Sequence, residues 1–144
     1  MDSKTDQKLG QTVTASNLAN RNIQIEDDRT GMSVETLKRA FADNLFYLQG
    51  KDESNATLHD YYQALAFTVR DRLLHRFIKT GRTYYEEDVK VVSYLSAEFL
   101  MGRHLENNLI SLGIYEKMRE VVREFNLNLE DLVEEEPDPG LGNG

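Results

Sequence analysis

The chain contains no cysteine in its 144 residues. This absence excludes disulfide bonds and thiolate metal sites, and it fits a protein of the reducing cytoplasm. Long apolar runs are also missing, because the longest candidates are interrupted by arginine or aspartate, so the sequence predicts no membrane span. Residues 1–17 are polar and lack the apolar stretch of a secretory signal. Together these absences predict a cytoplasmic protein.

Positive charge is scarce. Lysine and arginine number 17 against 25 aspartates and glutamates, which gives a net charge of −8. A chain this acidic is a poor candidate for binding nucleic acid or an anionic membrane surface. The charge is uneven, because residues 70–82 are basic and residues 116–138 are acidic. We interpret the acidic stretch as a solvated face and predict no metal site there.

The three histidines, His59, His75 and His104, are isolated in the sequence. None forms an HxxxH pair or lies in a carboxylate motif, so surface or packing roles are expected for all three. No catalytic triad and no zinc site can be assembled from the chain.

The hydrophobic content of 40% is enough for one core in a chain of this size. Residues 1–32 show little periodicity and are predicted to be a flexible N-terminal arm, followed by the domain proper at 33–144. Ser33 offers a helix N-cap, and Gly50 is expected to end that helix. Between them apolar residues recur at helical spacing, namely Val34, Leu37, Phe41, Leu45 and Leu48.

A second, longer helix is predicted over residues 57–79. Thr57 and Asp60 resemble a capping box at its start, and Gly81 is expected to stop it. One apolar stripe runs along it, formed by Leu58, Tyr62, Leu65, Val69, Leu73 and Phe77. The opposite, exposed face is expected to carry Arg70, Arg72, Arg76 and Lys79.

Residues 90–96 (KVVSYLS) form the only convincing strand pattern. A lone strand needs partners, and no second stretch of similar quality exists, so part of the sheet is expected to lie elsewhere. Helices are predicted after it at 105–112 and 115–125, with a short acidic helix starting at 129 or 130. Pro137 and Pro139 are expected to end the helical run.

Two features suggest chemistry. Glu98 follows the predicted strand, where ligand sites open in α/β folds, and Arg103 lies close enough to pair with it. A purely structural Glu–Arg contact is the alternative, and spacing alone favours it over an active-site role. The final GLGNG is a weak match to a dinucleotide fingerprint, because no strand precedes it directly, and the residues alone favour a plain, flexible C-terminal tail.

Three stretches together carry a specific resemblance: DYYQALAFTVRDRL (60–73), TYYEEDVKVVSYLSAEFLMGR (83–103) and the terminal GLGNG. They are similar to the N-terminal part of the α-glucan phosphorylases, the glycogen, starch and maltodextrin phosphorylase family. The resemblance covers about residues 37–144 and is densest from 84 to 103.

The resemblance implies an α/β parent enzyme of the two-lobed GT-B glycosyltransferase type. This chain would be a mostly α-helical fragment with the first strand of the N-terminal Rossmann-like lobe. The implied reaction is phosphorolysis, in which inorganic phosphate releases α-glucose 1-phosphate from the non-reducing end of an α-1,4-glucan. Pyridoxal 5'-phosphate would be bound by a lysine outside this chain, so the fragment alone is expected to be inactive, and the parent is expected to be a cytoplasmic homodimer.

Site residues carried over by the resemblance are few. Glu98 matches an acidic catalytic position near sugar and phosphate. Leu100 matches a position near the cofactor, and Gly144 is also assigned to cofactor binding. Leu141, Asn143 and Gly144 match the first half of a phosphate-facing glycine loop, which in the family continues as Gly-Leu-Gly-Arg into a helix.

The chain also departs from the family's regulated members. Gln24 stands where animal enzymes carry a phosphorylated serine. Gly81 and Arg82 replace two glutamines of the nucleotide site, whereas Tyr85 matches its tyrosine. These departures argue against both of those switches.

Two other interpretations remain open at this level. A self-contained helical interaction module would unfold cooperatively as an isolated chain. A nucleotide-binding regulatory domain built on the glycine loop would bind AMP or NAD.

Overall fold

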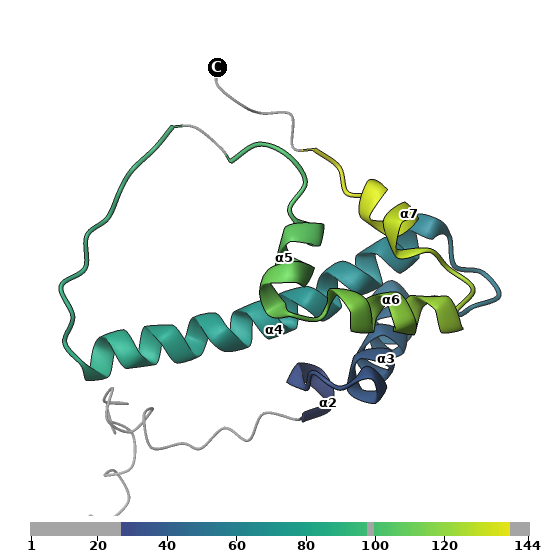
Figure 1. The fold of residues 1–144 in the computed structure, drawn as a ribbon, viewed down its shortest axis with the longest axis horizontal. Helices are drawn as coiled ribbons and strands as arrows, with labels where there is room; N and C mark the ends of the chain where they lie inside the picture. Colours follow the sequence, from purple (N-terminus) through teal and green to yellow (C-terminus); the bar gives the residue numbers. More distant parts are fainter. Residues whose placement is uncertain (1–26, 98–99, 139–144) are drawn as a thin grey trace, which may run out of the picture.

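The computed structural model describes residues 27–97 and 100–138 (Figure 1). These residues form helices joined by short links and one long connection. In chain order the helices are α2 (Asp27–Thr30), α3 (Val34–Asp43), the π-helical turn η1 (Asn44–Leu48), α4 (Leu58–Glu86), α5 (Leu105–Leu112), α6 (Tyr115–Glu124) and α7 (Leu129–Glu134). The predicted arm falls mostly on residues 1–26, outside the described residues, and its boundary at residue 32 stays a prediction.

Helix α3 begins where the sequence predicted. The Ser33 hydroxyl accepts a hydrogen bond from the Thr36 backbone N–H, so one of the unpaired N–H groups of the first turn is satisfied. Leu37 and Phe41 on its apolar face are fully buried. The predicted stripe ends early, because the backbone widens into the η1 turn and leaves Leu48 46% exposed.

Helix α4 starts at the predicted capping box. The Asp60 carboxylate accepts from the Thr57 N–H at 2.8 Å, and the Thr57 hydroxyl accepts from the Asp60 N–H at 3.3 Å. The predicted end at residue 79 is wrong, because the helix continues through Gly81 to Glu86. Glycine weakens a helix by about 1 kcal/mol relative to alanine but does not remove a backbone hydrogen bond, as proline does.

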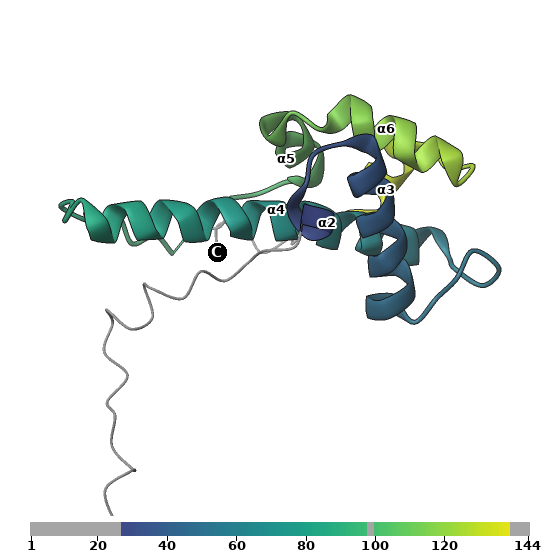
Figure 2. The ribbon, with the colours of Figure 1, turned by 90° about the horizontal axis from the view of Figure 1, so that it is seen from below.

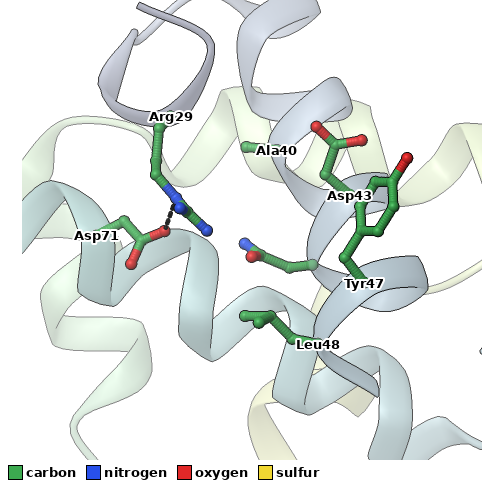
Figure 3. A pocket seen from close by; sticks show the side chains of 7 residues that line it. Arg29, Ala40, Asp43, Tyr47, Leu48 and Asp71 are labelled. Atoms are coloured by element: carbon green, nitrogen blue, oxygen red, sulfur yellow. Dashed lines mark hydrogen bonds and ion pairs between the residues drawn. The ribbon is translucent and has the colours of Figure 1, made fainter. Parts of the chain in front are cut away.

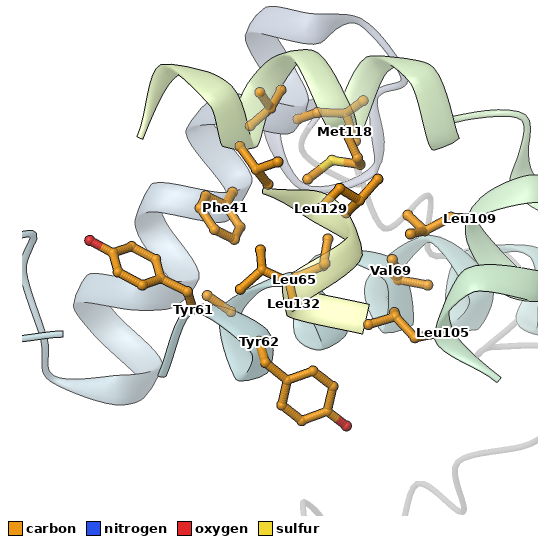
Figure 4. Close-up of a cluster of buried hydrophobic side chains, with 14 of the residues drawn as sticks. Phe41, Tyr61, Tyr62, Leu65, Val69, Leu105, Leu109, Met118, Leu129 and Leu132 are labelled. Atoms are coloured by element: carbon orange, nitrogen blue, oxygen red, sulfur yellow. The ribbon is translucent and has the colours of Figure 1, made fainter. Parts of the chain in front are cut away.

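The core lies around the first half of α4 (Figure 4). Leu65 and Val69 on this helix belong to the same buried cluster as Phe41 of α3, and the bundle is closed by α5, α6 and α7. The residues that fill it from these last helices are Leu105, Leu109, Leu112, Met118, Val121, Val122, Leu129, Leu132 and Val133. Figures 1 and 2 show the second half of α4 extending away from the other helices.

Arg72 corrects the predicted exposed face of α4. Its side chain is only 1% exposed and lies under the link between α2 and α3. The guanidinium donates to the Gly31 carbonyl, at 3.0 Å from Nε and 2.6 Å from Nη2, and to the Thr68 carbonyl at 2.8 Å. The helical pattern predicts that Arg72 faces solvent, because the spacing of residues along α4 says nothing about the α2–α3 link that covers it.

The strand predicted at 90–96 is wrong for this chain. No strand occurs anywhere in the described residues, and the stretch from 87 to 104 forms an irregular connection from α4 back to α5, broken in the description at 98–99 (Figure 1). Val92 and Leu95 are 87% and 91% exposed. A strand needs a neighbouring strand to bond its N–H and C=O groups, and the described part of the chain supplies none.

The last helices agree with the sequence. Helix α5 has the predicted bounds, α6 ends at Glu124, one residue before the predicted end, and α7 starts at Leu129. Gly113 closes α5 in the left-handed conformation with φ of 71°. The mostly helical character of the chain is therefore confirmed. None of the helices in the described ranges combines the length and apolarity that crossing a membrane requires.

Candidate functional site

Only one of the predicted site residues lies in the described part of the chain. Glu98, Leu141, Asn143 and Gly144 lie outside it. Leu100 is described, and its side chain is 80% exposed. The site must therefore be built from the residues that flank the predicted positions on either side.

The carboxylate of Glu136 caps helix α5 from the far end of the chain. Its two oxygens accept from the His104 N–H at 3.0 and 2.9 Å, and Oε2 also accepts from the Leu105 N–H at 2.7 Å. His104 occupies the N-cap position of α5 without a capping side chain of its own. A carboxylate here is favoured by both the unpaired N–H groups and the helix dipole.

Arg103 adds a second connection to the same end of α7. Its Nε donates to the Glu136 carbonyl at 2.9 Å, and its guanidinium forms an ion pair with Glu134. The sequence suggested Glu98 as the partner of Arg103. Glu98 itself lies outside the described residues, and the partners that the structure shows are Glu134 at the end of α7 and the Glu136 carbonyl just after it.

We call Arg103, His104, Glu134 and Glu136 the clamp. The His104 Nε2 also lies 3.2 Å from the Leu100 carbonyl, so the chain from 100 to 105 is fastened to 134–136. The clamp thus joins the two segments on which the sequence placed the candidate site: residue 98 lies five residues before Arg103, and the glycine loop begins four residues after Glu136.

Glu136 was missed by sequence reasoning. It stands in a run of three glutamates, which was interpreted only as a solvated acidic face. No local pattern could single it out, because its N–H partners lie 31 and 32 residues away in the sequence. The only usable signal was that α5 lacks a Ser, Thr, Asp or Asn at its N-cap.

A separate pocket of about 280 Å³ lies between α2, α3, η1 and α4 (Figure 3). Arg29 and Asp71 point toward one another across it and form an ion pair at 2.9 Å. Asn44, also in its wall, donates to the buried Thr68 hydroxyl at 2.9 Å. These four polar groups pair with one another, as polar groups do where helices pack together. They leave no sign of a ligand in this pocket.

Comparison with known proteins places these features in a family. No protein-family model matches the chain. The chain is 59% identical over 130 residues to a glycogen phosphorylase of Synechocystis sp.. The matched residues make up 90% of this chain and 15% of that protein. The chain is 46% identical over 111 residues to the brain-form glycogen phosphorylase of Bos taurus, with 77% of this chain and 13% of that protein covered. It is also 46% identical over 112 residues to the human liver form, with 78% and 13% covered.

The chain thus spans only about one seventh of the length of these relatives. Within that span the similarity includes most of the helices described above. Over the residues that it covers, the chain belongs to the glycogen phosphorylase family.

Proposed function

We propose that this chain is part of an α-1,4-glucan phosphorylase, a glycosyltransferase. Such an enzyme uses inorganic phosphate to release α-glucose 1-phosphate from the non-reducing end of glycogen, starch or maltodextrin. The observation that carries the proposal is the 59% identity over 130 residues to a glycogen phosphorylase. Because the chain spans 15% of that relative, most of the machinery would lie in residues beyond it.

The distribution of apolar side chains supports the proposal. The second half of α4 and the connection after it form what we call the open face, whose large apolar side chains are mostly exposed: Phe77, Ile78, Tyr85, Val91, Val92, Tyr94, Leu95 and Leu100. Apolar surface of this extent on a soluble domain marks an interaction site. We propose that the remainder of the enzyme covers the open face, and that residues 90–96 pair there as a strand of a Rossmann-like lobe in a two-lobed GT-B fold.

In this proposal the site residues have distinct roles. Glu98 acts near the sugar and phosphate. Leu141, Asn143 and Gly144 form a loop that presents backbone N–H groups to phosphate, which is the usual chemistry of anion recognition at a helix N-terminus. The clamp joins the chain that follows Glu98 to the chain that precedes the glycine loop, so Arg103 and Glu136 would position them without touching substrate.

The cofactor proposed for the whole enzyme is pyridoxal 5'-phosphate, held by a lysine outside this chain. When bound, its phosphate group would supply acid–base chemistry toward the substrate phosphate. The described residues fit a contact with it at Leu100, whose exposed apolar side chain has no partner in the core and is free to pack against a ring. Gly144 would approach the cofactor through its backbone. We also propose that the whole enzyme is a cytoplasmic homodimer.

The test compares the 144-residue chain with the longer gene product that contains it. We expect phosphate-dependent release of glucose 1-phosphate from glycogen by the longer protein and none by the 144 residues. In the longer protein Glu98→Gln should lower kcat strongly, whereas Glu106→Gln, an exposed position on α5, should not. Phosphorolysis and stoichiometric cofactor binding by the 144 residues, or a longer protein with neither, would overturn the proposal.

The comparisons do not favour the alternative of a self-contained interaction module. The relatives that match most of this chain are named as glycogen phosphorylases, which are enzymes. The phosphorylase proposal also predicts that the gene encodes Gly-Leu-Gly-Arg in frame after residue 144, which sequencing of the gene would check.

A further inference from the structure

The segment from Leu100 to His104 contains a turn that is closed by a side chain. Gly102 has a φ of 94°, a backbone conformation that residues other than glycine rarely adopt. Across this turn the Nε2 of the His104 imidazole lies 3.2 Å from the Leu100 carbonyl oxygen. Residues 100–103 belong to no helix or strand, so the position of the Leu100 backbone depends on this contact more than on regular secondary structure.

The contact determines which ring nitrogen of His104 carries the proton. A carbonyl oxygen only accepts hydrogen bonds, so Nε2 must be the donor. The neutral ring is therefore expected in the tautomer that has its proton on Nε2 and none on Nδ1. This expectation gives the contact a direct spectroscopic signature.

The backbone of His104 is fixed to the rest of the bundle. Its N–H donates to the two carboxylate oxygens of Glu136, at 3.0 and 2.9 Å. The next residue, Leu105, is buried and belongs to the hydrophobic core. The Leu100 side chain, in contrast, is exposed and lies outside the core. The imidazole thus ties an exposed residue to a fixed point.

We propose that His104 is a positioning residue, whose imidazole holds the Leu100 carbonyl so that the Leu100 side chain is presented to the cofactor of the whole enzyme. This inference rests on the proposed function, because the cofactor contact at Leu100 is part of that proposal. A backbone already held at its carbonyl loses less conformational freedom when a ring packs on the side chain, so the contact costs less free energy. His104 does not touch the cofactor and acts only through Leu100.

The role goes beyond what the position of His104 in the sequence indicates. No metal-ligand or catalytic motif surrounds this residue, and a surface or packing role is the expectation from the sequence. A merely structural hydrogen bond would stabilise the chain and leave the surroundings of the cofactor unchanged. The proposed role predicts that both change together.

The first experiment uses the longer gene product with pyridoxal 5'-phosphate bound. His104→Phe keeps a ring but removes the donor, and His104→Gln restores an N–H donor at a similar reach. We expect His104→Phe to shift the fluorescence spectrum of the bound cofactor and to lower kcat by about fivefold, the effect of one lost hydrogen bond. The KM for glycogen should stay within about twofold, because Leu100 is not placed on the glucan. His104→Gln should restore most of the spectrum and of kcat.

The matched control is His59→Phe, which replaces another histidine by the same residue. His59 is exposed, and its ring nitrogens lie near Gln63 and Glu135. We expect this variant to change neither the cofactor spectrum nor kcat.

The second experiment uses the 144-residue chain and needs no activity. Nitrogen NMR of the neutral imidazole should show His104 protonated on Nε2. The heteronuclear NOE of the Leu100 amide should fall in His104→Phe and recover in His104→Gln. Circular dichroism and the urea midpoint verify that each variant remains folded.

The two experiments distinguish the possible failures. A longer protein without phosphorolysis and without cofactor binding contradicts the proposed function, and the short chain then still shows whether His104 holds Leu100. The positioning role is overturned if His104→Phe leaves the cofactor spectrum of an active longer protein unchanged, or leaves the Leu100 amide as ordered as before. It is also overturned if His104→Gln is as impaired as His104→Phe.

Discussion

At the scale of single residues, the junction between η1 and α4 depends on one buried polar pair. The Asn44 amide donates to the Thr68 hydroxyl at 2.9 Å, and that hydroxyl donates to the Ala64 carbonyl at 2.8 Å. Asn44 is 3% exposed and Thr68 0%. Neither group can turn to water, so the Asn44 amide depends on the Thr68 hydroxyl as its acceptor.

We expect Thr68→Val to lower the free energy of unfolding by about 1–3 kcal/mol, because it leaves the Asn44 amide buried and unpaired. The double variant Asn44→Leu/Thr68→Val should lose less than the sum of the two single variants, since no polar group is then left alone. Urea unfolding measures all three. Strictly additive losses would show that the two side chains are not coupled.

Glu136 makes the clamp testable. Glu136→Gln removes the negative charge that caps α5, and we expect a loss of about 0.5–2 kcal/mol in the free energy of unfolding. Amide hydrogen exchange at His104 and Leu105 should accelerate, because their N–H groups donate to this carboxylate. Glu120→Gln is the control, an exposed glutamate of α6. Unchanged exchange in the Glu136 variant would contradict the capping role.

At the scale of elements, the start of α4 is set by a charge. Hydrogen bonds from the backbone N–H and the hydroxyl of Thr57 lower the pKa of the Asp60 carboxyl below its ordinary value. A carboxyl with a lowered pKa in the folded state stabilises the fold above its unfolded pKa of about 3.9. This contribution disappears as the pH falls through the lower, folded pKa.

We therefore expect the urea midpoint to fall as the pH drops from 6 toward 3, and part of that fall to be absent in Asp60→Asn. At pH 6 the variant should be less stable than the unmodified chain, and the difference should shrink in acid. Midpoints measured at a series of pH values provide the comparison. A difference that stays constant with pH would exclude ionised Asp60 as the source.

Two glycines that follow apolar helical patterns in the sequence differ in their place in the structure, because Gly81 lies inside a helix and Gly113 ends one. Gly81 lies inside α4 with open space where a Cβ would stand, so Gly81→Ala should stabilise the chain by about 0.5–1 kcal/mol. Gly113 ends α5 with φ of +71°, so Gly113→Ala should destabilise it by about 1–2 kcal/mol. Thermal or urea unfolding of the pair gives both signs, and equal signs would contradict the assignment of the two backbone conformations.

Helix starts could be predicted from the sequence, and some ends could not. Ser33 and Thr57 bond N–H groups within their own first turn, so three or four adjacent residues contain the whole interaction. The end of α4 is different, because Gly81 permits either a stop or a continuation, and the helix continues to Glu86. The strand at 90–96 failed for a related reason: its β-branched residues favour an extended backbone, but pairing requires another strand.

At the scale of the whole molecule, the open face should govern how the chain behaves in solution. The apolar side chains of Val92, Leu95 and their neighbours are almost fully exposed, and surface of this kind favours self-association. We expect the isolated chain to associate at high concentration and to bind a hydrophobic dye.

Val92→Lys/Leu95→Lys should reduce both association and dye binding. It should leave the free energy of unfolding within about 0.5 kcal/mol, because neither side chain packs on the core. Sedimentation velocity and dye fluorescence measure the first two quantities, and urea unfolding measures the third. An unmodified chain that is monomeric and binds no dye would instead fit a self-contained module.

The sequence by itself determined the helical character, the starts of the two main helices, the buried positions Leu37 and Phe41 of α3 and the family, because each depends on short patterns of side chains. It also located candidate chemistry at residues 98–100 and 141–144, of which the structure describes only Leu100. Only the tertiary structure decided that Arg72 is buried and that Glu136 caps a helix 31 residues away. These features arise where distant segments meet, and no local pattern records which segment supplies the partner.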